Sequence, residues 1–172
     1  MPLTKKPDAV HSTIALRAAR KSDAPAIAEL RTAFWFDQIS KGSIDHPDIE
    51  PTRLLTDTDK LIERARTFVL LATDNDKPAG YILGQTKILP GVAGSPISSI
   101  EELFVEPAYR RTNMAQSLVE KIIAEFRTSG AQRIQLRVLE GNGEGRKFWR
   151  RMDFDPSVTI YEYMKLGNPT NR

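Results

Sequence analysis

The feature that most constrains the fold is an amphipathic helix that follows a short apolar strand after a tight polar loop. Its apolar residues recur every four positions at Met114, Leu118, Ile122 and Phe126. This spacing places them on one helix face, which must be buried against another layer. Gly130 ends the helical pattern, and Pro107 ends the preceding strand at 97–105. The sequence therefore predicts a strand, a loop and a helix packed onto a sheet.

The rest of the chain supplies the other elements of one α/β (α+β) domain. A first helix is expected after a cap at Ser22 or Asp23, a second over 53–66 and a short one over 144–152. Strands are expected at 14–17, 68–72, 78–89, 97–105, 134–138 and 158–166. The predicted order is β-α-α-β-β-β-α-β-α-β, in a single domain over 13–172 behind a flexible tail at 1–12.

Composition excludes several kinds of chemistry. The chain has no cysteine, which removes thiol nucleophiles, thiolate zinc sites and redox dithiols. Its two histidines, His11 and His46, sit in no ligand-like cluster, so we expect no metal. The 25 basic residues are interspersed with 22 acidic ones, which predicts no nucleic-acid partner. A signal peptide and a membrane-spanning apolar run are both lacking, so we expect a cytoplasmic protein without a membrane partner.

The loop between the strand at 97–105 and the following helix has the features of an anion site. The first backbone N–H groups of a helix lack partners, and the helix dipole adds partial positive charge there. Arg110 and Arg111 add two full charges. Taken alone, these arginines could equally face water or bind a phosphate.

A wider pattern around this loop resembles the central motif of the GNAT acetyltransferase superfamily. Val105-x-Pro107-x-Tyr109-Arg110-x-x-Asn113-x-Ala115 is similar to its Arg/Gln-x-x-Gly-x-Gly/Ala loop, whose amides bind the pyrophosphate of acetyl-CoA. Asn113 replaces a glycine, and asparagine is the best substitute if φ must be positive there. The resemblance implies a mixed, mostly antiparallel sheet of six to seven strands with about four helices. It also implies cofactor binding by Leu103, Phe104, Val105, Arg110, Arg111, Thr112, Asn113, Met114, Ala115 and Gln116.

A second segment strengthens the resemblance. Asn142-x-x-Gly145-x-x-Phe148-Trp149-x-x-x-Asp153-Phe154 is similar to the family's Asn-x-x-Ala-x-x-Phe-Tyr-x-x-x-Gly-Phe. In the family the asparagine contacts the pantetheine arm and the aromatic pair packs near the sulfur, so Asn142, Phe148 and Trp149 are predicted cofactor residues. The aromatic pair could also be helix core. Trp149 replaces a tyrosine that acts as an acid, and an indole N–H cannot take that role.

Two adjacent glutamates are the candidate catalytic residues. Ile100-Glu101-Glu102-Leu103-Phe104-Val105 resembles the polyamine/diamine acetyltransferase branch, which has an acidic pair here. Glu101 is the predicted general base, acting through water on the acceptor amine. Strand alternation places Glu101 and Glu102 on opposite faces unless a bulge intervenes. The alternative for either residue is a solvated glutamate at a strand end.

The acceptor site is expected in the region of the first two helices. Asp37, Asp45, Asp48 and Glu50 lie near an aromatic run at 34–36, which would suit a cationic amine or could be a solvated loop. The predicted function is transfer of an acetyl group from acetyl-CoA to a primary amine of a small or amino-acid-like molecule, with an oxyanion donor at a backbone N–H near Phe104 or Val105. The alternatives are a degenerate acyl-CoA-binding sensor and an acetyltransferase for peptide or protein N-termini. A homodimer is possible for this fold.

Overall fold

The computed structural model describes residues 14–42, 50–88 and 96–158. The chain divides into two compact units, Met1–Gly141 and Asn142–Arg172, each of which is described by itself. The flexible tail predicted at 1–12 lies outside the described residues, and the single domain over 13–172 stays a prediction.

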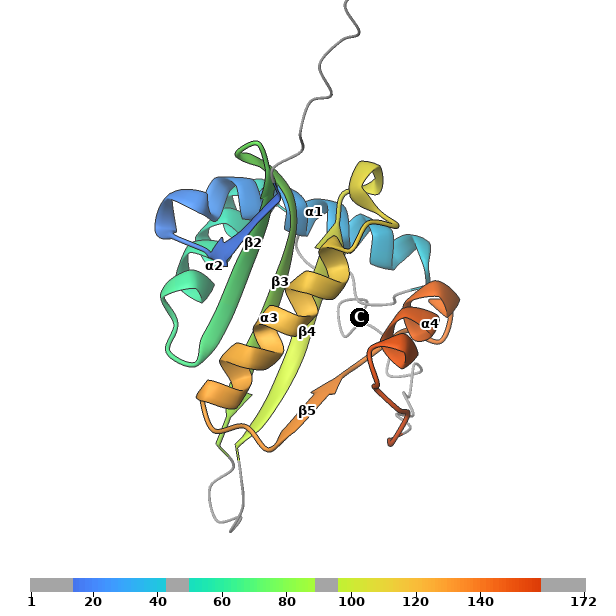
Figure 1. Cartoon of the computed structure of the whole chain (residues 1–172). Coiled ribbons are helices and arrows are strands. Elements are labelled where there is room, and N and C mark those ends of the chain that lie inside the picture. Colours follow the sequence, from blue (N-terminus) through green and yellow to red (C-terminus); the bar gives the residue numbers. More distant parts are fainter. Residues whose placement is uncertain (1–13, 43–49, 89–95, 159–172) are drawn as a thin grey trace, which may run out of the picture. The chain divides into compact units, whose positions relative to one another are not determined.

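A five-stranded sheet forms the centre of the first unit within the described ranges (Figure 1). Its strands lie in sequence order: β1 Ile14–Ala18, β2 Thr67–Asp74, β3 Lys77–Lys87, β4 Ile97–Val105 and β5 Arg133–Leu136. All neighbouring pairs are antiparallel except β4 and β5, which are parallel. The mixed, mostly antiparallel sheet is confirmed, and the described residues contribute five strands to it where six to seven were predicted for the whole chain. The predicted strand at 158–166 lies outside the described residues after Val158.

Helices cover both faces of this sheet. Helices α1 (Ala24–Ser40) and α2 (Pro51–Glu63) pack on one face, and α3 (Met114–Thr128) lies across the other (Figure 1). Short 3-10 turns precede α1 at Lys21–Asp23 and α3 at Pro107–Tyr109. The fourth described helix, α4 (Gly143–Arg151), belongs to the second unit. None of the described helices is both long and apolar enough to cross a membrane.

The apolar patterns read from the sequence form the buried layers. On one face, Ile27, Leu30 and Phe34 of α1 pack against a sheet surface that includes Tyr81, Leu83 and Phe104. On the other, the four-residue repeat of α3 is fully buried, as predicted. Leu55 of α2, by contrast, is 38% exposed. Leu54 and Thr58 occupy the inward face of α2 instead.

Gly84 sets the distance between α3 and the sheet. A Cβ atom at this position would lie 2.5 Å from Phe126 Cζ and 2.8 Å from the Ser99 carbonyl oxygen. The aromatic ring and the strand backbone can approach each other this closely only because the glycine has no side chain.

Replacing Gly84 with alanine should therefore lower the free energy of unfolding by about 1–3 kcal/mol, the usual cost of overpacking. Urea titration of the purified variant measures this change. Gly143→Ala is the matched control, because a Cβ atom there meets nothing within 4 Å. Equal stability of the two variants would contradict this account of the α3 packing.

Candidate active site

Strand β4 has one edge that is paired along only part of its length. On one side, β3 pairs with β4 as far as Val105. On the other side, β5 pairs with β4 over Ile97–Ile100, and the described residues supply no further strand at this edge. Backbone groups of successive strand residues point alternately to the two edges, so those of residues 101–105 that point to this edge have no strand partner. The predicted oxyanion donors near Phe104 and Val105 lie in this stretch.

A β-bulge at Glu101 changes the direction of the side chains on β4. Glu102 pairs with Leu83 and Ile100 pairs with Gly84, so Glu101 is the extra residue between two successive pairs. Glu102 hydrogen-bonds Tyr81, which belongs to the core on the α1 face. Glu101 hydrogen-bonds Gln85, which alternation along β3 places on the same face as Tyr81 and Leu83. Both glutamates therefore lie on the face that carries α1.

Glu101 is partly exposed and is held by two hydrogen bonds. Its Oε1 atom accepts from Gln85 Nε2 at 2.8 Å and from Ser99 Oγ at 2.5 Å. Burial raises the pKa of this carboxyl, but the hydrogen bonds from Ser99 and Gln85 and the charges of Lys87 and Arg137 outweigh it, so the pKa is lowered. Glu101 is thus an ionised carboxylate at neutral pH, and its Oε2 atom has no partner in the described chain.

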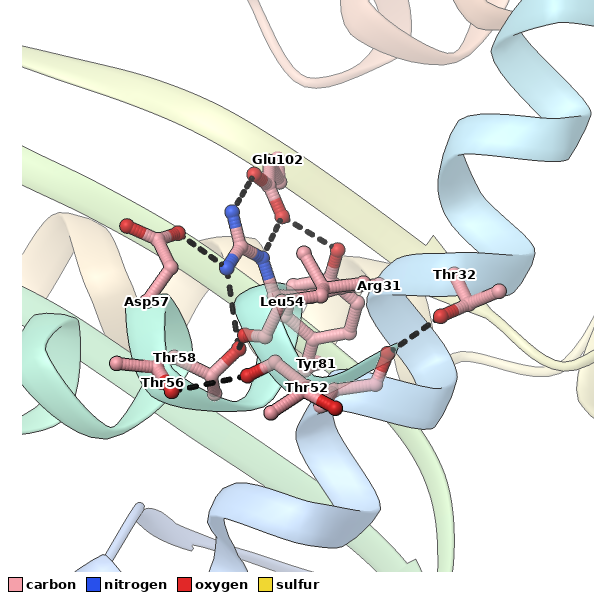
Figure 2. Close-up of polar contacts among 10 residues, drawn as sticks. Arg31, Thr32, Thr52, Leu54, Thr56, Asp57, Thr58, Tyr81 and Glu102 are labelled. Atoms are coloured by element: carbon pink, nitrogen blue, oxygen red, sulfur yellow. Dashed lines mark hydrogen bonds and ion pairs between the residues drawn. The ribbon is translucent and has the colours of Figure 1, made fainter. Parts of the chain in front are cut away.

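Glu102 is buried and fully engaged (Figure 2). Arg31 of α1 donates to it in a two-point arrangement, from Nε to Oε2 at 2.9 Å and from NH2 to Oε1 at 2.8 Å. The Tyr81 hydroxyl donates to Oε2 at 2.6 Å. Each oxygen of Glu102 is therefore occupied by the protein itself, unlike those of Glu101.

Arg31 also reaches α2. Its NH1 atom donates to Asp57 at 2.7 Å and to Thr58 Oγ1 at 3.0 Å. Burial lowers the pKa of Arg31, but the hydrogen bond and charge of Glu102 outweigh it, so the pKa is raised. Burial and the neighbouring Glu102 charge raise the pKa of Tyr81 well above its usual value, which keeps the phenol protonated.

Sequence reasoning missed this buried network. A sign of it was present, because Arg31 falls inside the i, i+3, i+4, i+7 stripe that Ile27, Leu30 and Phe34 define. A charged residue at a core position of a helix implies a buried partner. The identity of that partner, 71 positions away in the sequence, depends on the tertiary fold.

In the loop before α3, the residue with a positive φ is Arg111, whereas Asn113 was the residue considered from the sequence. Asn113 is the N-cap of α3 with φ −78°, and the left-handed residue is Arg111 with φ 64°. Asparagine is therefore present at 113 without the backbone requirement that would favour glycine. Thr112 secures the turn, since its hydroxyl donates to the Tyr109 carbonyl at 2.6 Å and accepts from the Met114 N–H at 3.3 Å.

The start of α3 retains free backbone donors. Asn113 makes no side-chain cap. In the region that the structure describes, the N–H groups of Ala115 and Gln116 have no acceptor. The side chain of Gln116 turns to Glu120 at 2.8 Å. These amides can bind an anion, which fits the predicted contact with a pyrophosphate.

Arg110 is directed toward the end of β4 and α1. Its Nε atom donates to the Val105 carbonyl at 3.1 Å, and its NH2 atom donates to Asp37 at 3.3 Å. The guanidinium lies 5.5 Å from the centre of the Phe104 ring. Arg110 thus joins the loop to α1, whereas Arg111 and Thr112 are exposed at the loop surface.

Of the four acidic residues predicted at the acceptor site, Asp37 and Glu50 are described, and both have partners. Asp37 binds Lys41 and Arg110. Glu50 caps α2 by accepting from the N–H groups of Thr52 and Arg53 at 3.0 and 2.9 Å. Asp45 and Asp48 lie outside the described residues. Within the described ranges, no three potential metal-binding side chains form a group.

The second unit contains the predicted pantetheine residues on α4. The Asn142 side chain caps the helix by accepting from the Gly145 N–H at 2.9 Å. Trp149 stacks edge-to-face with Phe148 and Phe154, at ring-centre distances of 5.1 and 5.3 Å. The aromatic pair therefore contributes to the packing of its own unit. The cofactor roles of Asn142, Phe148 and Trp149 stay predictions.

Asp153 occupies a left-handed position that ends α4. Its φ is 62°. Its N–H donates to the Arg150 carbonyl at 3.1 Å, and the Phe154 N–H donates to the Trp149 carbonyl at 3.0 Å. This pattern is a Schellman motif, with the usual apolar contact between Trp149 and Phe154. Glycine adopts this conformation without strain, which fits the glycine in the family motif that this segment resembles.

Comparisons with known proteins agree with this architecture. Residues 25–154 match the model of the acetyltransferase (GNAT) family. An uncharacterized N-acetyltransferase of Methanocaldococcus jannaschii is 21% identical over 106 residues, which are 62% of this chain and 47% of that protein. The chain thus spans about half the length of this curated relative.

Solved structures show the same fold at low sequence identity. An aminoglycoside N-acetyltransferase, AAC(6')-Iy in complex with CoA, has a TM-score of 0.75 at 18% identity, covering 95% of this chain and 100% of that one. A transcriptional regulator from Bacillus halodurans has a TM-score of 0.73 at 15% identity, covering 88% and 99%. A ribosomal-protein-alanine N-acetyltransferase from Brucella melitensis has a TM-score of 0.67 at 14% identity, covering 88% and 99%.

Asp153→Gly should stabilise the chain by about 1 kcal/mol, because glycine adopts the left-handed conformation without the Cβ penalty. Urea unfolding monitored by the fluorescence of Trp149 and Trp35 measures the gain. The matched control is Asp155→Gly, an exposed position without a positive φ, where the substitution should not stabilise. A loss of stability in Asp153→Gly would contradict the role given to this motif.

Proposed function

The chain belongs to the acetyltransferase (GNAT) family, and from this membership we propose that it transfers the acetyl group of acetyl-CoA to a primary amine of a small molecule. The predicted membership of the GNAT superfamily is thereby confirmed, and it supports the predicted acyl-CoA-dependent N-acyltransferase. The observation that carries the proposal is the open edge of β4, where an ionised Glu101 stands on a bulge in the strand that leads to the helix start with free N–H groups.

Acetyl-CoA supplies an activated thioester, and the chain supplies the groups that hold it. The free amides of Ala115 and Gln116 and the dipole of α3 suit the pyrophosphate, with Arg111 at the loop surface adding charge. Unpaired backbone N–H groups near Phe104 and Val105 would stabilise the oxyanion that forms on the thioester carbonyl. The family motif supports pantetheine contacts by Asn142, Phe148 and Trp149.

Glu101 is the proposed general base. An alkylammonium acceptor has a pKa near 10, so it must lose a proton before its nitrogen attacks the carbonyl carbon. Glu101 is ionised and keeps Oε2 available, and a water between this atom and the amine would relay the amine proton to the carboxylate, which then releases it to solvent. Glu102 has no such freedom, because Arg31 and Tyr81 occupy its oxygens. We therefore assign catalysis to Glu101 and a supporting role to Glu102.

The CoA thiolate can leave without protonation by a general acid. The bond from the carbonyl carbon to sulfur breaks as the nitrogen bond forms, and the electron pair leaves with the sulfur. A thiol has a pKa of about 8.5, so its thiolate can leave without an acid. Trp149 cannot donate that proton, and Tyr81 is fixed to Glu102. Tyr161 and Tyr163 lie outside the described residues.

Three classes of amine are candidate acceptors for this site. Structural neighbours include an acetyltransferase bound to the aminoglycoside sisomicin and one named for ribosomal-protein alanine, and the sequence around Glu101 resembles the polyamine branch. Small polyvalent amines are the proposed class. A cationic acceptor would have to compete with Lys41 and Arg110 for Asp37.

Acetyl-CoA should raise the thermal unfolding midpoint of the protein, and desulfo-CoA analogues that keep the diphosphate should do so as well. Thiol release is then followed with sisomicin, spermidine and a peptide with an N-terminal alanine. Release with sisomicin or spermidine supports the proposal, and release with the peptide alone would move the assignment to N-terminal acetylation. A thermal shift without any turnover would favour a cofactor-binding sensor, and no shift would remove the cofactor claim.

Glu101→Gln should reduce kcat by roughly 100-fold, the usual contribution of a general base, and leave the acetyl-CoA thermal shift unchanged. Because the pKa of Glu101 is lowered, its carboxylate stays ionised from neutral pH to below its usual value of about 4.3. The rise of kcat/KM between about pH 6 and 9 should therefore come from the acceptor amine and persist, at a lower level, in the variant.

The matched control is Glu29→Gln, an exposed glutamate on α1. It should leave both kcat and the pH profile as in the wild type. Wild-type activity in Glu101→Gln would exclude this residue as the base.

A further inference from the structure

Arg31 and Glu102 form a buried, two-point ion pair between α1 and β4. Both side chains are 7% exposed, and the two N–O distances are 2.8 and 2.9 Å (Figure 2). Removing such charges from water is costly, and a hydrophobic pair of similar volume often serves stability equally well. Stability alone therefore does not explain why this buried position holds a charged pair, which points to an additional role.

The pair is joined to its surroundings without an unsatisfied group. Tyr81 donates to Glu102 from β3, and Asp57 and Thr58 accept from Arg31 on α2. No buried side-chain nitrogen or oxygen of the described residues lacks a hydrogen-bond partner. Two helices and two strands are thus fixed to one another through a single guanidinium.

Glu102 is the first regularly paired residue after the bulge. It stands opposite Leu83, and the extra residue before it is Glu101. Without the bulge, regular alternation would place Glu101 opposite Leu83 and turn Glu102 toward the apolar α3 side. With the bulge, both carboxylates lie on the α1 face, and Arg31 binds the second while the first is left available. The contact of Arg31 with Glu102 therefore selects one of two registers for this part of β4.

We propose that Arg31 is a positioning residue whose buried pair with Glu102 fixes the β4 bulge and thereby presents Glu101 to the acceptor amine. This inference rests on the proposed acetyl transfer for its kinetic readout. Arg31 acts through the strand and touches neither substrate. Bulges beside active sites commonly redirect a side chain in this way, and the buried ion pair supplies the specificity for one register.

Variants of the ion pair can distinguish an effect on stability from an effect on the position of Glu101. Arg31→Met should lower stability strongly, because it leaves the Glu102 charge buried and unpaired. The paired variant Arg31→Met/Glu102→Leu removes both charges and should recover part of that stability in urea unfolding; the buried Tyr81 hydroxyl still loses its acceptor. Its kcat should nevertheless remain about 10- to 100-fold below wild type, as expected for a misplaced catalytic group, while KM for acetyl-CoA is unchanged.

Arg17→Met is the matched control. Arg17 forms a similar two-point pair with Asp23, but the pair is more exposed and lies away from β4, so kcat should not change. Arg31→Lys gives a second test in case the paired variant does not fold. A lysine keeps the charge but cannot make the two-point contact, so kcat should fall while the fold persists. Wild-type kcat in either Arg31→Lys or a stable paired variant would overturn the inference.

Backbone amide hydrogen exchange makes the test independent of the acceptor. If the pair fixes the bulge, the amides of residues 100–103 should exchange faster in the paired variant than in the wild type, whereas those of α3 should not. Should the wild type acetylate neither sisomicin, spermidine nor the alanine peptide, the proposed function fails and exchange alone decides. Unchanged exchange at 100–103 would then overturn the role of Arg31.

Discussion

The unequal pairing of β4 is the constraint on which the rest of the first unit depends. One edge is paired with β3 to the end of the strand, and the other is paired with β5 over four residue pairs. A fully paired strand would have no free backbone groups near Phe104 and Val105, and a strand free on both edges would not hold them in place. Partial pairing leaves the backbone groups that point to the open edge without a strand partner on a rigid element, an arrangement that would suit the proposed stabilisation of an oxyanion.

The same strand carries the proposed base and a structural carboxylate. Glu101 and Glu102 are adjacent and chemically identical, and their environments separate them. Hydrogen bonds from neutral Ser99 and Gln85 hold Glu101 in a partly exposed position. A cation and a phenol enclose Glu102. Local surroundings therefore decide which of two equal groups is available for proton transfer.

Much of the fold followed from periodicity, because burial of one face leaves a direct trace in the sequence. The repeat of α3, the limits of β4 and the glycine with φ 83° at position 130 all agree with the predictions. The cap motif around Asp153 was visible only as a departure from a family pattern, and its cause became clear from the positive φ.

The arrangement within the site was less accessible from the sequence. Alternation alone separates Glu101 from Glu102, and a bulge depends on pairing with a strand almost 20 positions away, so neither its presence nor its location has a local marker. The link from Arg31 to Glu102 likewise depends on long-range packing. At Asn113 the family motif raised the question of a positive φ, and the positive φ of this loop occurs at Arg111 instead.

The Arg31 guanidinium bonds one buried carboxylate and one solvent-exposed carboxylate. Glu102 is 7% exposed, whereas the Asp57 side chain is 56% exposed. Dissolved ions weaken attractions that water can reach and have little effect on buried ones. Rising ionic strength should therefore loosen the hold of α1 on α2 long before it loosens the hold of α1 on β4. Of the two links that Arg31 makes, the one between α1 and the sheet is shielded from salt and the one between α1 and α2 is exposed to it.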